Sequence, residues 1–185
     1  MLDASVNPLE RIRPLTRIEY DALITLGLLE GERVELLQGA MVVMSAQTPR
    51  HAAVIRRLHK LLAQHLGERA DVQSRLPLTL DEYSVLEPDL AVVFAEFPED
   101  DHPSHAFLVV EVADTSLAKD RNIKATIYAA SGIPEYWIVN LEDNVVEIHK
   151  DGERGTYRAI TLASRGDTVA LEMFPDVQIP VADIL

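Results

Sequence analysis

The apolar segment FLVVEVA, residues 107–113, contains a single carboxylate, Glu111, among aliphatic side chains. A buried carboxylate is costly unless it is paired, protonated or bound to a metal ion. A second acid, Asp89, follows Pro88 at the start of another apolar segment, DLAVVFA, residues 89–95. If the two segments form neighbouring strands about 4.8 Å apart, a suitable register places both carboxylates within reach of one ion. Because Mg²⁺ binds through oxygen ligands, often one or two carboxylates, this pair predicts a site for Mg²⁺ or Mn²⁺.

Two further charged residues could complete such a site. Lys124 lies about two turns into a helix predicted over residues 117–131. Its ammonium group could orient an attacking water or stabilise charge on a phosphate. Glu35 lies in the strand-like segment RVELL, residues 33–37, and could assist at the same ion. Together these residue types favour metal-dependent hydrolysis of a phosphodiester.

Each of the four residues also has a purely structural explanation, and some of their polar neighbours do too. We interpret His51 as a capping or surface residue and Gln73 as a solvated strand residue beside the site. Among the four site residues, Glu111 could form a core ion pair with Lys124 or Arg121, and Asp89 could cap a turn. Lys124 could form a helical ion pair with Asp120, and Glu35 could pair across its hairpin with a surface cation.

The chain has 185 residues, no cysteine and a formal net charge of −13. The length suits one domain, residues 1–185, with residues 1–15 as an N-terminal arm. Without cysteine there are no disulfides or thiolate metal sites, so any metal must use oxygen or nitrogen ligands. The negative charge disfavours broad, nonspecific binding to nucleic acid. It leaves room for a local basic surface, because charges more than about 10 Å apart are largely screened at about 0.1 M salt.

The first residues, MLDASVNPLERIRPL, lack the basic and apolar regions of a signal peptide. No apolar run reaches the roughly 18 residues that a membrane span requires. We therefore expect a cytoplasmic protein with no membrane partner.

The predicted elements follow one another in a mixed order of helices and strands, which is typical of an α/β sheet with helices packed on it. Helices are predicted over residues 16–28, 50–66 and 117–131. The first follows from a capping box at Thr16 and Glu19, and the second from an apolar stripe at Ile55, Leu58, Leu62 and Leu66. The third is ended by Gly132 and Pro134. Strands are predicted within 33–45, on either side of the turn Gln38-Gly39, and over 72–80, 89–95, 107–113, 135–140, 145–150, 156–162, 168–172 and 177–181, the last three completing the sheet.

The ordered set of Asp89, Glu111 and Lys124 is similar to the pattern of PD-(D/E)xK nucleases. More closely, the chain resembles the Uma-two family of restriction endonucleases, in RVELLQGAMVVMS, EPDLAVVF, LVVEVADTS and DRNIKATIYAASGIPEYWIVN. The resemblance implies an α/β restriction-endonuclease-like core, with a central mixed β-sheet flanked by helices. It also implies that Asp89 and Glu111 are metal ligands, that Lys124 is the catalytic lysine, and that Glu35 is an accessory acid at the metal. One departure is Ala113, which stands where the pattern has its lysine, so that Lys124 must substitute from the helix.

From these observations we predict an endonuclease that uses Mg²⁺ or Mn²⁺ and acts on nucleic acid, specifically DNA. A homodimer is expected because one small acidic domain offers little surface to hold a duplex, and EYWIVN and VVEIHK are expected to form a surface shared by two copies. Two other functions remain open. One is a catalytically silent binding module with a nuclease fold, which the acidic balance and Ala113 favour. The other is a metal-dependent hydrolase of small nucleotides.

Overall fold

A computed structural model gives the structure of residues 13–96 and 101–185. The predicted arm over residues 1–15 thus lies, for residues 1–12, outside the described residues. Within the described ranges, the helices are α1 (Arg17–Thr25), α2 (Pro49–Leu66), the 3-10 helix η1 (Gly67–Arg69), α3 (Leu117–Lys119), the π-helix η2 (Asp120–Lys124), α4 (Ala125–Ala130) and α5 (Val181–Ile184). None of these described helices has the length and apolar character needed to cross a membrane.

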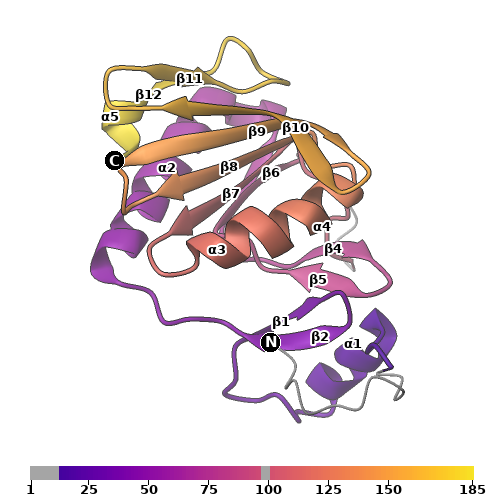
Figure 1. Ribbon diagram of the computed structural model, residues 1–185. Coiled ribbons are helices and arrows are strands. Elements are labelled where there is room, and N and C mark those ends of the chain that lie inside the picture. Colours follow the sequence, from indigo (N-terminus) through magenta and orange to yellow (C-terminus); the bar gives the residue numbers. More distant parts are fainter. Residues whose placement is uncertain (1–12, 97–100) are drawn as a thin grey trace.

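The strands of residues 13–96 and 101–185 form three sheets (Figure 1). The largest has the order β10-β9-β8-β7-β6-β3 and is mixed, because β7 and β8 run parallel whereas the other neighbours run antiparallel. A four-stranded antiparallel sheet has the order β2-β1-β5-β4, and β11 pairs with β12 alone. The strands are β1 (Val34–Leu37), β2 (Ala40–Val43), β3 (Asp71–Gln73), β4 (Leu78–Asp81), β5 (Ser84–Leu86), β6 (Leu90–Val93), β7 (Leu108–Ala113), β8 (Glu135–Asn140), β9 (Val145–Glu153), β10 (Thr156–Ala163), β11 (Thr168–Ala170) and β12 (Gln178–Pro180).

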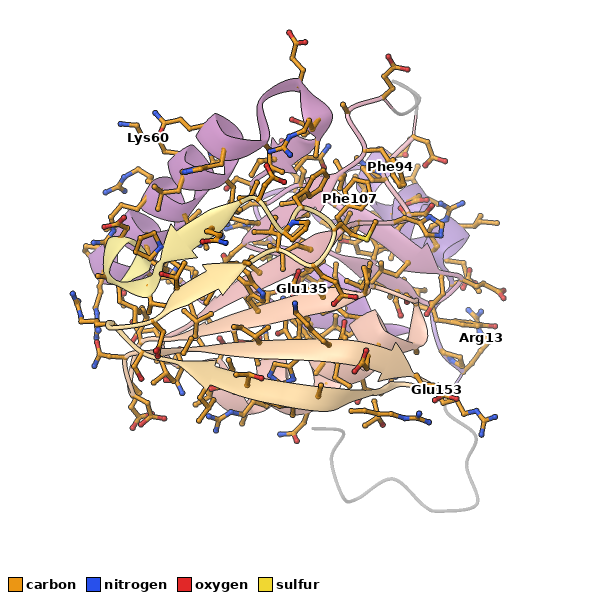
Figure 2. All side chains as sticks on the ribbon, turned by 90° about the horizontal axis from the view of Figure 1, so that it is seen from above. Arg13, Lys60, Phe94, Phe107, Glu135 and Glu153 are labelled. Atoms are coloured by element: carbon orange, nitrogen blue, oxygen red, sulfur yellow. The ribbon has the colours of Figure 1, made fainter. Side chains whose placement is uncertain are left out.

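Helix α2 covers one face of the six-stranded sheet (Figure 1 and Figure 2). It begins where the side chain of Thr48 accepts a hydrogen bond from the backbone N–H of His51, with Pro49 in the first turn. Leu58 and Leu62 lie on the buried stripe of the helix and pack in one core with residues of β6, β7 and β8. The helix predicted from this stripe is therefore confirmed.

The opposite face of the six-stranded sheet is covered by α4 and by the four-stranded sheet. Ile127 and Tyr128 of α4 and Leu37 of β1 pack in one core with Val109 and Ile138 of the six-stranded sheet. Because both faces are covered, every residue of β6, β7 and β8 is buried, which explains their continuous apolar sequences. The predicted α/β class, with a central mixed sheet flanked by helices, is confirmed.

The segment predicted as one strand over residues 72–80 is divided between two sheets. Strand β3 ends at Gln73 and joins the six-stranded sheet, whereas β4 begins at Leu78 and joins the four-stranded sheet. Between them Arg75 has a φ of 57°, and Pro77 has no backbone N–H to donate, so an extended strand cannot continue. Strand β5, which pairs with β1 and β4, has no counterpart among the predicted elements.

The last strands differ from the prediction in two respects. Strand β10 extends the main sheet as predicted, but β11 and β12 form a separate sheet. Strands β8 and β9 lie inside the six-stranded sheet, and all six residues of β8 are buried. The expectation that EYWIVN lies on a surface between two copies is therefore wrong, whereas for VVEIHK, in the partly exposed strand β9, it stays a prediction.

Candidate active site

Asp89 and Glu111 lie on the same face of the six-stranded sheet. Strands β6 and β7 pair antiparallel with Leu90 opposite Val110, so the register continued by one residue places Asp89 opposite Glu111. Both side chains are buried and line the same cavity. The two strands therefore bring together the carboxylates that the sequence pattern paired.

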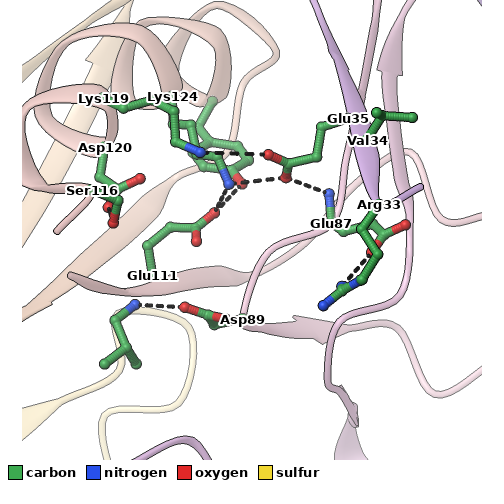
Figure 3. Close-up of polar contacts among 12 residues, drawn as sticks. Arg33, Val34, Glu35, Glu87, Asp89, Glu111, Ser116, Lys119, Asp120 and Lys124 are labelled. Atoms are coloured by element: carbon green, nitrogen blue, oxygen red, sulfur yellow. Dashed lines mark hydrogen bonds and ion pairs between the residues drawn. The ribbon is translucent and has the colours of Figure 1, made fainter. Parts of the chain in front are cut away.

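Lys124 links Glu111 to Glu35 (Figure 3). Its ammonium Nζ donates a hydrogen bond of 2.8 Å to Glu111 Oε1 and one of 2.9 Å to Glu35 Oε1, and only 2% of the residue is exposed. The lysine belongs to the π-helical turn η2, a rare conformation that recurs at functional sites. Glu35 comes from β1, so this contact joins the four-stranded sheet to the six-stranded one.

All four predicted site residues line one cavity of about 100 Å³. Its other walls are the segment before α2, the first turn of α2, and the connection from β7 to η2. Three basic side chains, Arg75, Lys119 and Lys124, face six carboxylates: Glu35, Glu87, Asp89, Glu111, Asp114 and Asp120. With these side chains ionised and His51, which also lines the cavity, neutral, the lining has three more negative than positive groups.

Glu111 and Glu35 each accept hydrogen bonds at one carboxylate oxygen and not at the other. Glu111 Oε1 accepts from Lys124 Nζ and from the Tyr128 hydroxyl at 2.8 Å, while Oε2 has no hydrogen bond to a described residue. Glu35 Oε1 accepts from Lys124 and from the backbone N–H of Glu87 at 2.9 Å, while Oε2 is buried, has no hydrogen bond to a described residue and lies 3.9 Å from Lys119 Nζ. A buried carboxylate oxygen without a donor is unusual and points to a missing cation or water.

Burial and neighbouring charge shift the proton equilibria of the central pair. Burial raises the pKa of Glu111 to about 8 against the opposing charge of Lys124, and Asp89 adds to the rise. For Lys124, burial lowers the pKa, but the carboxylates of Glu111 and Glu35 more than reverse this effect, so its pKa is raised. The ammonium group of Lys124 is thus held charged. For Glu111, the attraction of Lys124 does not offset the cost of ionising a buried carboxyl group.

Asp89 is fixed by residues that were not predicted to touch it. His51 Nε2 lies 3.1 Å from Asp89 Oδ2, which also accepts from the backbone N–H of Val112 at 2.9 Å. Gln47 donates to Oδ1 at 3.2 Å. The interpretation of His51 as a capping or surface residue is wrong, because the imidazole is buried against Asp89. The sequence carries no signal for this contact, since it depends on where α2 begins relative to β6.

Gln73 is also placed differently from the prediction. It is buried rather than solvated, it donates to Asp71 Oδ2 at 3.3 Å, and it is not part of the cavity lining. Strand β3 pairs Gln73 with Ala91, so Gln73 lies on the same face of the sheet as Asp89 but outside the cavity.

The structural alternatives for the site residues are partly realised. Glu111 does pair with Lys124, while Arg121 instead forms a two-point contact with Glu147 at 2.7 and 3.0 Å. Asp120 accepts from the Ser116 hydroxyl rather than from Lys124. A structural ion pair would balance its charges, and the excess of carboxylates around this pair is what distinguishes the cavity from an ordinary buried salt bridge.

The carboxylates of the cavity are ligands of the type that a divalent cation prefers, but their oxygens do not surround one point. Among the described residues, no three His, Asp or Glu side chains already stand in an arrangement that could hold a metal ion. Lys124 Nζ instead lies between Glu35 and Glu111, at 2.9 and 2.8 Å from one oxygen of each. The open oxygens of Glu35 and Glu111, together with Asp89, nevertheless supply the hard ligands that Mg²⁺ and Mn²⁺ prefer.

Comparison with known proteins agrees with this architecture. A model of the Uma2 family, described as "Putative restriction endonuclease", matches residues 19–182. The chain belongs to this family. A crystal structure described as a putative nuclease belonging to DUF820 from Anabaena variabilis is similar, with a TM-score of 0.69 and 13% identity, over 92% of this chain and 97% of that chain. This similarity shows a shared fold. A search of curated proteins gives no match.

Proposed function

We propose that this protein is an endonuclease that uses Mg²⁺ or Mn²⁺ to hydrolyse phosphodiester bonds in DNA. The observation that carries the proposal is the cluster of buried carboxylates around Lys124, in which Glu35 and Glu111 each keep an oxygen without a hydrogen bond. Membership of a family of restriction-endonuclease type supports the same reading. The proposal treats the chain as a single nuclease-like domain.

Asp89 and Glu111 would hold the ion, with Glu35 assisting. When bound, such an ion polarises a phosphoryl oxygen and makes water a better nucleophile. Val112, Gln47 and His51 keep the carboxylate of Asp89 oriented through hydrogen-bond or ion-pair contacts at 2.9, 3.2 and 3.1 Å. This fixed orientation lets the site accept a cation without a large entropic cost.

Lys124 would serve the reaction as a fixed positive charge. Its raised pKa keeps the ammonium group protonated at neutral pH, so it acts as a hydrogen-bond donor and not as a base. Placed beside the ligands, it can orient the attacking water or stabilise the negative charge that grows on the phosphate in the transition state.

A homodimer is part of the proposal, because a small acidic chain offers little surface for a duplex. The long strand β10 is a free edge of the main sheet, and Ile160 and Leu162 on it are 58% and 63% exposed. Such edges are common places for a second strand to add. A monomeric mass by light scattering at the concentration used for cleavage would remove this part.

Calorimetric titration with Mn²⁺ tests the metal site directly. Wild type should bind, and Asp89→Asn should bind at least about ten-fold more weakly, since even residues that only support a ligand contribute about 10–100-fold. Glu135→Gln is the matched control, because Glu135 is equally buried but accepts from Trp137 Nε1 outside the cavity. No Mn²⁺ binding, with Asp89→Asn identical to wild type, would instead support the binding module.

The substrate is tested with supercoiled plasmid DNA, RNA and a dinucleotide in Mn²⁺. We expect the plasmid to be nicked and cut by wild type and not by Lys124→Met, which should still bind Mn²⁺. Cleavage of the dinucleotide without cleavage of the plasmid would support the hydrolase of small nucleotides.

A further inference from the structure

Arg75 is a positively charged residue of the cavity wall without a direct counter-ion. It lines the same cavity as Asp89 and Glu111, yet its guanidinium group forms no ion pair and no hydrogen bond with any residue that the structure describes. Its Nε atom is buried and has no acceptor. Buried N–H groups nearly always have a partner in a folded protein, so this guanidinium group lacks an anion.

The backbone holds Arg75 in this place. Its N–H donates to the carbonyl oxygen of Pro88 at 3.1 Å, and the hydroxyl of the preceding Ser74 donates to the carbonyl oxygen of Asp89 at 3.2 Å. The φ of Arg75 is 57°, in the left-handed region that favours glycine. Strained residues of this kind concentrate at ligand sites, where the surrounding structure maintains them.

The electrostatic surroundings of Arg75 point to an anion that arrives from outside. Burial lowers the pKa of Arg75, and the charge of Arg33 lowers it further. Arg33 has its own partner, because its Nη2 lies 3.1 Å from Glu87 Oε2. The carboxylates of the cavity attract Arg75 only from a distance, and an arginine remains charged in proteins.

We propose that the guanidinium group of Arg75 binds the non-bridging oxygens of the phosphate group that the substrate places in this cavity. The inference rests on the proposed function, and it names the recognised group as a phosphodiester of nucleic acid. The planar, forked donors of arginine match two phosphate oxygens at once. Arg75 would then hold the phosphate from the segment that follows β3, while Lys124 of η2 and the carboxylates would act from other parts of the cavity wall.

Arg75→Gly tests this role without burdening the fold. Glycine removes the side chain and also suits a φ of 57°, so the variant should fold with at least the thermal midpoint of wild type. Arg75→Lys keeps the charge but not the fork. Arg69→Ala is the control, because Arg69 forms an exposed pair with Asp176 and does not line the cavity.

The probe is thymidine 3′,5′-bisphosphate, titrated by calorimetry in the presence of Mn²⁺, alongside kcat and KM for a labelled DNA duplex. Losing one charge-assisted contact should weaken the bisphosphate and raise KM by about 10–100-fold in Arg75→Gly. Arg75→Lys should have a bisphosphate affinity and a KM between those of wild type and Arg75→Gly. Arg69→Ala should match wild type in both. The affinity for Mn²⁺ itself should not weaken in Arg75→Gly, since the change removes a positive charge from the site.

Three results would overturn the inference. If wild type binds the bisphosphate and cleaves DNA, and Arg75→Gly does both equally well, only the role of Arg75 is lost and the proposed nuclease stands. If Arg75→Gly loses Mn²⁺ binding, Arg75 supports the carboxylates and not the phosphate. If wild type neither cleaves DNA nor binds the bisphosphate, the inference falls together with the proposed function.

Discussion

Replacing Glu111 by glutamine should change how the stability of the fold depends on pH. The carboxylate is buried, and burial raises its pKa to about 8 from an ordinary value of 4.5. Glutamine has nearly the same shape and keeps an oxygen that can accept from Lys124 and Tyr128, but it carries no titrating proton. The comparison therefore isolates the titration of one side chain.

The sign and the size of the effect follow from linkage. Between pH 4.5 and about pH 8 the folded protein keeps the Glu111 proton while the unfolded chain releases it, so raising the pH in this window destabilises wild type. The stabilising contribution is complete below pH 4.5 and is lost as the pH rises through about 8. At about 1.4 kcal/mol for each pH unit, this window of about 3.5 units corresponds to a loss of about 5 kcal/mol.

The assay is urea unfolding of wild type and Glu111→Gln at pH values from 5 to 9. The free energy of unfolding of wild type, relative to the variant, should fall by about 1.4 kcal/mol for each pH unit up to about 8 and then level off. Contributions from histidine titration cancel in the difference, because both proteins contain the same histidines.

The control is Asp176→Asn, a change at an exposed carboxylate, whose free energy of unfolding should depend on pH as that of wild type does. Saturating Mn²⁺ should flatten the wild-type curve, because a cation favours the ionised carboxylate. Parallel curves for wild type and Glu111→Gln would refute the reasoning.

Other substitutions have clear expected outcomes. Lys124→Met leaves the buried carboxylate of Glu35, and above about pH 8 also that of Glu111, without their shared cation, and at pH 9 it should lower the free energy of unfolding in urea by about 3–5 kcal/mol; a loss below about 1 kcal/mol, as for a surface pair, would contradict the buried contact. Leu58→Ala removes a fully buried side chain and should cost about 2–5 kcal/mol while leaving Mn²⁺ affinity unchanged in calorimetry. Gly39→Ala should lower the thermal midpoint, because a Cβ at this position, with φ of 80°, would stand 2.3 Å from Pro14 Cβ; an unchanged midpoint would show that the loop before α1 yields freely.

Much of the fold could be predicted from periodicity and turn chemistry. The capping box at Thr16 and Glu19 is present at the start of α1, and the turn at Gln38-Gly39 joins β1 to β2 with positive φ at both residues. The helix predicted over 117–131 is correctly placed, but its middle is a π-helical turn. Residue types alone do not reveal this turn, since it arises from packing against the sheet.

Which short strands pair with one another could not be predicted from the sequence. The residues of β3 and β4 have similar strand propensity, and their assignment to different sheets depends on the φ of Arg75 and on the partners that each strand meets. The same limit applies to the site. Asp89 and Glu111 could be found because acids in apolar strands are unusual, whereas His51 and Arg75 stand in ordinary surroundings in the sequence and become informative only through their neighbours in space.

The contact of Lys124 with Glu35 has a consequence for reading mutational scans of this protein. Glu35 reaches the cavity from the four-stranded sheet, which meets the six-stranded sheet at this buried seam. A substitution elsewhere in the hairpin of β1 and β2 that loosens it would move Glu35 out of the proposed active site, although the substituted residue does not line the cavity. A hairpin variant without activity is therefore explained first by displacement of the four-stranded sheet, and only then by loss of a second binding surface. Amide hydrogen exchange along β1 distinguishes these two explanations.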